Sequence, residues 1–132
     1  VPSVAPLKEK YRISDRYGYR THPISGERQF HAGLDMAAVY AATVHAAASG
    51  TVTFAGETPG YGKTVVVTHR FGFQTRYAHL TLIYTRKGAK VEKGDVIGFV
   101  GSTGISTGNH LHYEVIKNQK RINPLNFIYG TK

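Results

Sequence analysis

The sequence predicts an all-β domain, or a β-dominated α+β domain. Three observations support this: short runs of β-branched and aromatic residues recur along the chain, glycines separate many of them, and few windows carry the 3.6-residue apolar period of a helix. A chain of 132 residues has the length of one domain with one core. Its 41% hydrophobic and 19% charged residues are typical of a globular domain.

The expected strands follow one another with little between them. Residues 51–55 form a short β segment flanked by glycines. Residues 63–69 are rich in β-branched side chains, and residues 73–79 follow them after Gly72, so the two segments are expected to pair as an antiparallel hairpin. Residues 96–100 form another short apolar run.

The last expected strand is 111–116. Its residues alternate, with Leu111, Tyr113 and Val115 on one face and His112, Glu114 and Ile116 on the other. A short helix is expected around 36–42 or 123–128. Residues 1–11 are expected to be a linker or leading arm, and residues 12–132 to form the domain.

Composition excludes several classes of site and partner. The chain has no cysteine, so disulfides and thiolate metal sites are excluded and a metal would need His, Asp or Glu. No apolar run approaches the roughly 20 residues that span a bilayer. The first residues lack the features of a signal peptide, and we expect a mature form or an excised domain. The net charge of +9 favours polyanionic partners such as nucleic acid, anionic lipid or an acidic cell-wall polymer.

The pair His110 and His112 is the sharpest local feature. Residues i and i+2 of a strand project from the same face, so both imidazoles can point into one pocket. They would act as two metal ligands, or as one ligand and one catalytic base. A second feature is His31 with Asp35, which can meet at one point if the segment turns at Gly33.

Together these features indicate a catalytic metal site. One His and one Asp near the beginning and one His near the end supply three protein ligands, the number that catalytic zinc sites use while leaving a fourth position open. Zinc in such a site acidifies a water molecule and polarises a scissile carbonyl. Hydrolysis of an amide then needs no serine or cysteine nucleophile.

The chain resembles the lysostaphin/LytM-type zinc endopeptidases of bacterial cell walls over roughly residues 12–128. Segments similar to the family's motifs occur in the family's order. They are Tyr17 to Gly26, His31-Ala-Gly-Leu-Asp35, Ala47 to Val52, Tyr77-Ala-His79-Leu80, Val91 to Gly98, and Ser106 to Glu114 with its His110-Leu-His112. The chain departs from the family at Tyr17, Ala41 to Val44 and Asn109, and none of these is a candidate ligand.

The resemblance implies a fold, a metal and a reaction. The fold would be a twisted antiparallel sheet forming an open groove. His31, Asp35 and His112 would bind one Zn²⁺, while His79 and His110 would be catalytic and orient or deprotonate water or stabilise the oxyanion; the sequence does not rank them. Separately from the resemblance, Glu114 lies two residues beyond His112 and so on the same face of a regular strand, where it is expected either to fix an imidazole or to be an exposed carboxylate. His45 is expected to be a core or edge histidine, and His69 to lie in a solvated turn.

The implied function is hydrolysis of peptide cross-links in peptidoglycan, with D-Ala–diaminopimelate bonds favoured. The implied location is the cell envelope, periplasmic, or else secreted or wall-associated, with a membrane anchor in an upstream segment as one arrangement. The alternative is a catalytically silent or autoinhibited peptidoglycan-binding or activator domain. A biotinyl-type carrier barrel would leave His110 and His112 unexplained, and no nucleic-acid motif supports a nucleic-acid binder. The oligomeric state is not predicted.

Overall fold

The computed structural model describes residues 2–21, 24–104, 106 and 108–128. The strands are β1 (Tyr11–Asp15), β2 (Gly18–Thr21), β3 (Arg28–His31), β4 (Leu34–Ala38), β5 (Thr43–His45), β6 (Gly50–Thr58), β7 (Gly62–Thr68), β8 (Phe73–Ile83), β9 (Lys90–Val91), β10 (Val96–Val100), β11 (His110–Lys117) and β12 (Lys120–Ile122). Two short 3₁₀ helices, η1 (Arg70–Gly72) and η2 (Pro124–Phe127), complete the described elements.

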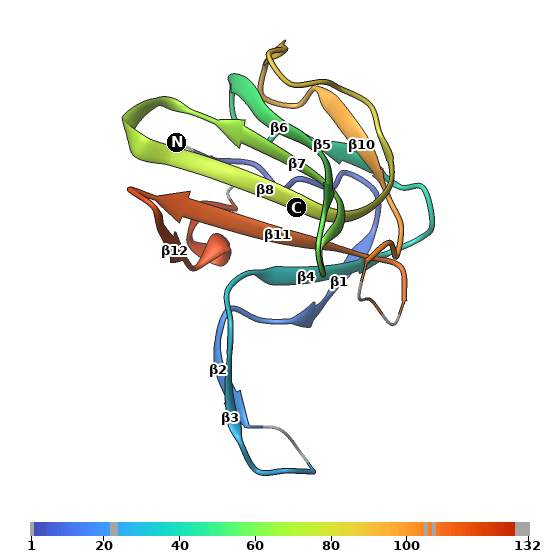
Figure 1. Cartoon of the computed structure of the whole chain (residues 1–132), viewed down its shortest axis with the longest axis vertical. Coiled ribbons are helices and arrows are strands. Elements are labelled where there is room, and N and C mark those ends of the chain that lie inside the picture. The colour runs from blue at the N-terminus through green and yellow to red at the C-terminus, as the bar shows by residue number, and fades with distance from the viewer. Residues whose placement is uncertain (1, 22–23, 105, 107, 129–132) are drawn as a thin grey trace.

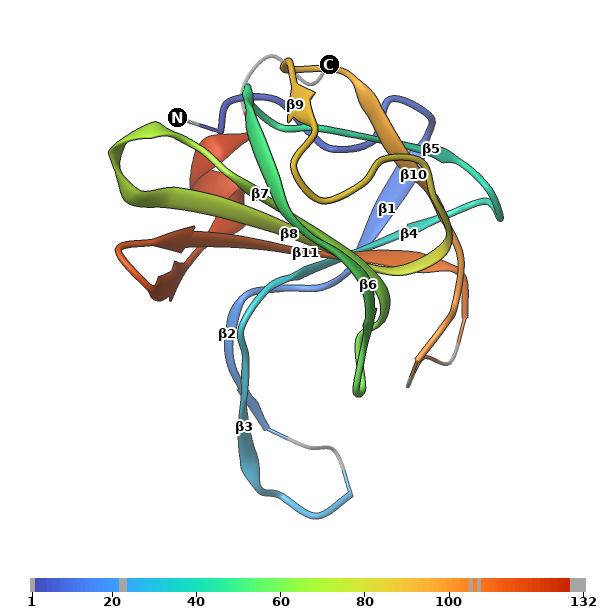
Figure 2. The same ribbon diagram turned by 45° about the horizontal axis from the view of Figure 1, so that its top comes forward.

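Ten of the strands form one antiparallel sheet, in the order β1-β4-β11-β8-β7-β6-β9 (Figure 1). Strand β10 pairs with β5 and β8, and β12 extends the sheet beside β11. Strands β2 and β3 form a separate hairpin that projects from the body, as Figure 2 also shows. The predicted all-β fold with an antiparallel sheet is therefore confirmed.

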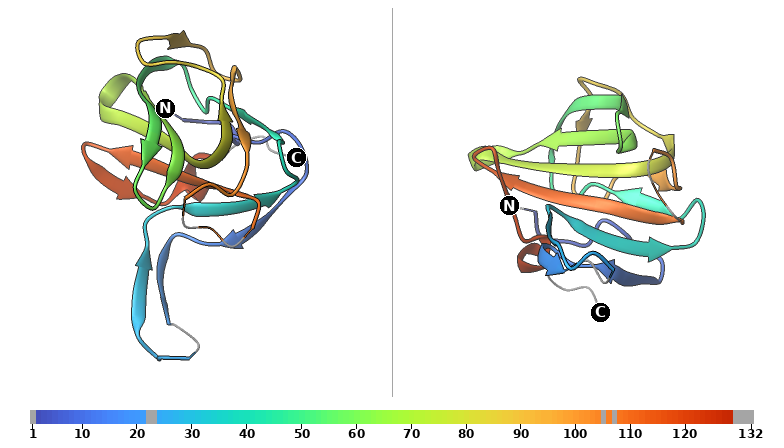
Figure 3. Two further views of the ribbon diagram at one scale, coloured as in Figure 1. Left: turned by 45° about the vertical axis from the view of Figure 1, so that its right-hand side comes forward. Right: turned by 60° about the horizontal axis from the view of Figure 1, so that its bottom comes forward.

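The five predicted strands are present, and three of them, β6, β8 and β11, are longer than predicted. The expected hairpin at 63–69 and 73–79 is β7 and β8, joined through η1. The segment 96–100 is β10, 51–55 lies within β6, and 111–116 lies within β11. Every residue of β11 from Leu111 to Ile116 is buried, so this strand has no face open to water. The strong curvature of the sheet is visible in Figure 3.

The predicted helix at 36–42 is wrong. Met36, Ala37 and Ala38 belong to β4, which pairs with β1 on one side and β11 on the other. Two ladders of backbone hydrogen bonds override the helix preference of these residues. At 123–128 the structure has the 3₁₀ helix η2, where the Asn123 side chain accepts a hydrogen bond from the Leu125 amide.

The core lies between the curled strands. Leu34, Met36, Leu80, Leu111 and Val115 are among its fully buried members. The leading arm joins it, since Leu7 is buried and bridges to Val44. In the part of the chain that the structure describes, no helix is long and apolar enough to cross a membrane.

The hairpin of β2 and β3 is braced by an aromatic cluster. Tyr17 and Tyr19 each pack edge-on against Phe30, and the Arg28 guanidinium lies over the Tyr19 ring. The Tyr17 hydroxyl donates to the Arg121 carbonyl oxygen of β12, which ties the foot of the hairpin to the main sheet. The hairpin ends at His31, so this bracing fixes where that side chain lies.

A β-bulge in β8 sets the direction of His79. Lys63 pairs with Leu80 whereas Val65 pairs with Tyr77, so β8 contains one extra residue between these pairs. His79 has φ of 63°, in the left-handed region that side chains other than glycine rarely adopt. Its amide donates to the Tyr61 carbonyl, which holds the strained backbone in place.

His69 is buried, so the prediction of a solvated turn is wrong. Its Nδ1–H donates to the Ser49 carbonyl, and its Nε2 lies 2.8 Å from the Thr75 hydroxyl. Thr75 in turn bonds the Tyr77 hydroxyl. Burial lowers the pKa of His69, and the bond to Ser49 offsets part of this effect.

The strain at His79 predicts opposite outcomes for two glycine substitutions. His79→Gly should unfold at a higher free energy than His79→Ala, by roughly 1 kcal/mol, since glycine adopts a positive φ freely. Ala78→Gly, at the adjacent ordinary backbone position, should be destabilised relative to the parent. Urea unfolding of the chelator-treated proteins measures all of these. If His79→Gly were no more stable than His79→Ala, the left-handed backbone at this bulge would be wrong.

The buried His69 predicts a pH dependence of stability. Its pKa is depressed in the folded state, so it contributes stability above about pH 6.5 that is lost as the pH falls, when the unfolded chain takes up a proton first. We expect His69→Gln to be less stable at pH 8 and to lose less additional stability than the parent between pH 7 and pH 5. Urea unfolding with a chelator present measures how the free energy of unfolding changes with pH in the parent and in His69→Gln. If the free energy of unfolding changed equally with pH in the two proteins, His69 would be protonated as easily in the folded state as in the unfolded state.

Candidate metal centre

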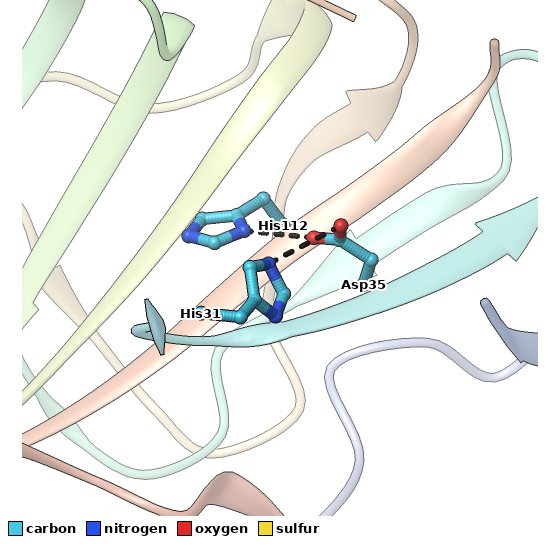
Figure 4. Close-up of side chains that lie close together, drawn as sticks. All are labelled: His31, Asp35 and His112. Atoms are coloured by element: carbon cyan, nitrogen blue, oxygen red, sulfur yellow. Dashed lines mark hydrogen bonds and ion pairs between the residues drawn. The ribbon is translucent and has the colours of Figure 1, made fainter. Parts of the chain in front are cut away.

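Three side chains from three strands converge at one point (Figure 4). His31 ends β3, Asp35 lies in β4, and His112 lies opposite Asp35 in the pairing of β4 with β11. One donor atom from each lies within 4.8 Å of the others. His112 Nδ1 is 2.8 Å from Asp35 Oδ1, and His31 Nε2 is 3.3 Å from Asp35 Oδ2.

This donor set suits zinc. Two imidazole nitrogens and a carboxylate oxygen are ligands that zinc accepts, and tetrahedral bonds of the usual length place such atoms about 3.4 Å apart. The two separations of 2.8 Å and 3.3 Å are close to that spacing. His112 Nδ1 and Asp35 Oδ1 form a hydrogen-bonded pair at this point.

The far side of each imidazole is already hydrogen-bonded. His31 Nδ1–H donates to the Arg16 carbonyl oxygen at 3.0 Å, which leaves Nε2 to face the centre. His112 Nε2–H donates to Glu114 Oε2 at 2.8 Å, which leaves Nδ1 to face it. A partner on one ring nitrogen selects the tautomer whose other nitrogen carries the lone pair.

His79 and His110 lie beside this centre. His79 Nδ1–H donates to the Thr103 carbonyl oxygen at 2.6 Å, and His110 Nδ1–H donates to the Gly108 carbonyl oxygen at 3.0 Å. Both therefore keep Nε2 available. Their rings are 4.8 Å apart, the His79 ring is 6.1 Å from that of His112, and His110 Nε2 is 3.8 Å from Asp35 Oδ1. The structure thus brings together all five residues that the sequence indicated.

The charges at the centre are coupled. Burial alone would lower the pKa of His112, but its hydrogen bonds to Asp35 and Glu114 raise it to about 9. Burial alone would raise the pKa of Asp35, and the bonds from His112 and His31 outweigh it and hold that pKa well below its usual range. His79 differs, because burial lowers its pKa more than the bond to Thr103 raises it. The lowered pKa of His79 favours its neutral form, which can accept a proton.

Gly33 is required by close packing. A Cβ at this position would lie 2.7 Å from the Tyr113 carbonyl oxygen and 2.8 Å from His112 Cε1, both too close. The sequence predicted a role in turning the chain between His31 and Asp35. Its backbone does not adopt a left-handed φ, so the reason for glycine is the room that the His112 ring needs.

Glu114 is the residue whose surroundings the sequence revealed least. It is fully buried, and besides His112 it accepts from Arg121 Nε at 3.1 Å and from the Tyr61 hydroxyl at 3.1 Å. Arg76 Nε lies 3.9 Å from the same carboxylate. Sequence reasoning named Glu114 but missed Tyr61 and Arg121, which carry no motif and are brought to it only by the pairing of β11 with β12 and by the turn before β7.

A surface depression lies away from this centre. It has a volume of about 740 Å³ and is lined by residues at the ends of β6 and β7, by β9 and by the segments that follow β7 and β9, and Arg70, Lys90 and Lys93 are among them. None of its lining residues belongs to the candidate metal centre.

Comparisons with known proteins identify the family. Residues 29–124 match the family described as Peptidase family M23. The DD-carboxypeptidase/endopeptidase Mpg of Neisseria meningitidis serogroup B is 48% identical over 120 residues, which are 91% of this chain and 28% of that protein. The chain thus spans just over a quarter of the length of this curated relative.

Solved structures agree with this match. A zinc-containing peptidase from Vibrio cholerae superposes with a TM-score of 0.83 at 33% identity, covering 92% of this chain and 38% of that one. The catalytic domain of lysostaphin from Staphylococcus simulans superposes with a TM-score of 0.80 at 30% identity, covering 89% of this chain and 91% of that domain. Since the matched residues include the whole candidate centre, this chain belongs to peptidase family M23.

Proposed function

We propose that this chain is a zinc-dependent endopeptidase that hydrolyses peptide cross-links in bacterial peptidoglycan. The observation that carries the proposal is the convergence of His31, Asp35 and His112, with His79 and His110 beside them. In this proposal the first three residues hold the metal and the other two are catalytic. The zinc-containing relative from Vibrio cholerae supports the choice of metal.

The chemistry follows from the tautomers. Zinc, when bound, supplies a Lewis acid that polarises the scissile carbonyl and acidifies water. The rings of His79 and His110 lie 4.8 Å apart and both bond a carbonyl through Nδ1, so in this proposal the Nε2 atom of one accepts the proton that the attacking water loses. The same proton can then pass to the leaving amine nitrogen. The second imidazole, when it has already taken up a proton on Nε2 from solvent, donates that N–H to the oxyanion. The similar hydrogen bonds of the two rings leave the assignment of base and donor open.

We propose a D-Ala–diaminopimelate cross-link as the bond that is cut. The relative Mpg is named a DD-carboxypeptidase/endopeptidase, which supports a bond next to D-alanine. The net charge of +9 would hold the domain on an anionic envelope, in keeping with a periplasmic or wall-associated location. An open substrate groove over the sheet, a peptidase domain at 12–132 after a leading arm at 1–11, and an upstream membrane anchor are parts of the same proposal.

The alternative is a silent or autoinhibited peptidoglycan-binding or activator domain. It shares the fold and the envelope location, so only catalysis separates the two. A complete set of donors, each with its far side hydrogen-bonded, favours the enzyme, since a binding module needs none of these bonds.

Substitutions should separate metal binding from turnover. We expect His112→Ala to abolish zinc binding, while His79→Ala and His110→Ala keep stoichiometric zinc and lose turnover by roughly 10²–10⁴-fold. His45→Gln, at a buried histidine bonded to Gly94 away from the centre, is the matched control and should keep both. Zinc content by elemental analysis and cleavage of a cross-linked muropeptide are the two measurements. Full zinc occupancy in His112→Ala would refute the ligand assignment.

Digestion of purified peptidoglycan tests the function itself. The zinc-loaded chain should release fragments cut at one bond type, identified by mass, and a chelator should stop the release until zinc is restored. Cleavage that persists in chelator would contradict a metal mechanism. A chain with stoichiometric zinc that releases nothing would support the silent or autoinhibited alternative.

A further inference from the structure

The Glu114 carboxylate is placed where a charge is costly unless it is paired. Its side chain has no exposed surface, and an isolated carboxylate in that position would be strongly unfavourable. One oxygen, Oε2, accepts from His112 Nε2–H and from the Tyr61 hydroxyl. The other, Oε1, accepts from Arg121 Nε and faces Arg76 at 3.9 Å. Because both oxygens accept hydrogen bonds, the carboxylate is held in one orientation.

That orientation determines the orientation of His112. A ring held at Nε2 by a fixed acceptor cannot rotate or change tautomer without breaking a buried charge-assisted hydrogen bond. Gly33 packs close to the same ring, since a Cβ there would lie 2.8 Å from His112 Cε1. The acceptor of His31 is a backbone carbonyl and cannot be removed by substitution, whereas the acceptor of His112 is a side chain. The contribution of the far-side bond is therefore testable only at His112.

Arg121 extends the support to the hairpin. Its Nε holds Glu114, while its carbonyl oxygen accepts from the Tyr17 hydroxyl at the foot of β2. Arg121 thus touches the supports of His112 and of His31. Its side chain is 37% exposed, so a substitution there leaves the core intact.

We propose that Glu114 and Arg121 are positioning residues for the metal centre, with Glu114 presenting His112 Nδ1 to the ion and Arg121 holding Glu114 in place. The inference rests on the proposed function only in taking His112 as a zinc ligand. It adds that zinc affinity depends on two residues that do not touch the metal.

Zinc affinity of the purified chain, measured by competition with a chromophoric chelator, tests this proposal. Glu114→Met, which keeps the length and removes the acceptor, should weaken zinc binding by roughly 10- to 100-fold. Glu114→Gln keeps an acceptor oxygen for His112 and should recover most of that loss. Arg121→Met should weaken binding several-fold. Lys120→Gln is the matched control, at an exposed neighbouring position of β12, and should bind zinc as the parent does.

Two further readouts separate positioning from stability. The metal-free variants are compared by thermal unfolding, and the His112 Nε2–H resonance of the zinc-loaded proteins is followed by NMR. Positioning requires that the resonance is protected from exchange in the parent and in Glu114→Gln but not in Glu114→Met. If Glu114→Met lowers only the stability and binds zinc as tightly as the parent, the proposal is overturned.

The outcomes remain distinct if a variant does not fold or the chain is inactive. If Glu114→Met does not fold, the zinc affinity of Arg121→Met tests the proposal instead. A zinc affinity equal to that of the parent would then refute the role of Arg121 in holding Glu114. A parent that binds zinc through His112 but cleaves no peptidoglycan would refute the proposed function and leave this test intact.

Discussion

The site depends on the register of β11 between β4 and β8. In this register His112 lies opposite Asp35 on one side and Ala78, next to the bulged His79, on the other. A slip by one residue would turn His110, His112 and Glu114 to the other face together, because side chains alternate along a strand. The register is held by burial, since Leu111, Tyr113 and Val115 are fully buried in the core. Packing of apolar residues on one face therefore places the polar residues on the other.

Charge imposes the second constraint. A mostly buried carboxylate, Asp35, and a fully buried one, Glu114, flank the same imidazole. The arrangement tolerates this because Arg121 and Arg76 face Glu114, while the proton on His112 balances Asp35. A cation at the centre would take over the role of that proton. The Asp35 carboxylate, which faces the centre, thus favours a cation there and would disfavour an anion.

Much of the fold could be predicted because its strands carry local signals. The hairpin of β7 and β8 is β-branched and turns at Gly72, and the alternation in β11 placed His110 and His112 on one face. Strand β4 could not be predicted, since Met36, Ala37 and Ala38 favour helix and become a strand only through their two neighbours. The hairpin of β2 and β3 has no apolar alternation and depends on the cluster around Phe30.

The candidate site shows the same division. The five candidate residues follow motifs in the sequence, whereas among the acceptors behind them only Glu114 was predicted. Arg16, Thr103 and Gly108 contribute only backbone carbonyls, which any residue possesses. The strained backbone of His79 and the burial of His69 likewise arise from contacts distant in the sequence. Sequence patterns thus identify which groups do chemistry but not how they are held.

The separate hairpin has a mechanical consequence. Asp35 and His112 belong to the main sheet, while His31 belongs to a two-stranded unit that pairs with no other described strand. An ion bound by all three residues would link the β2–β3 hairpin to the main sheet. A force that displaces the hairpin would then move His31 relative to Asp35 and His112 and so change the affinity for the ion.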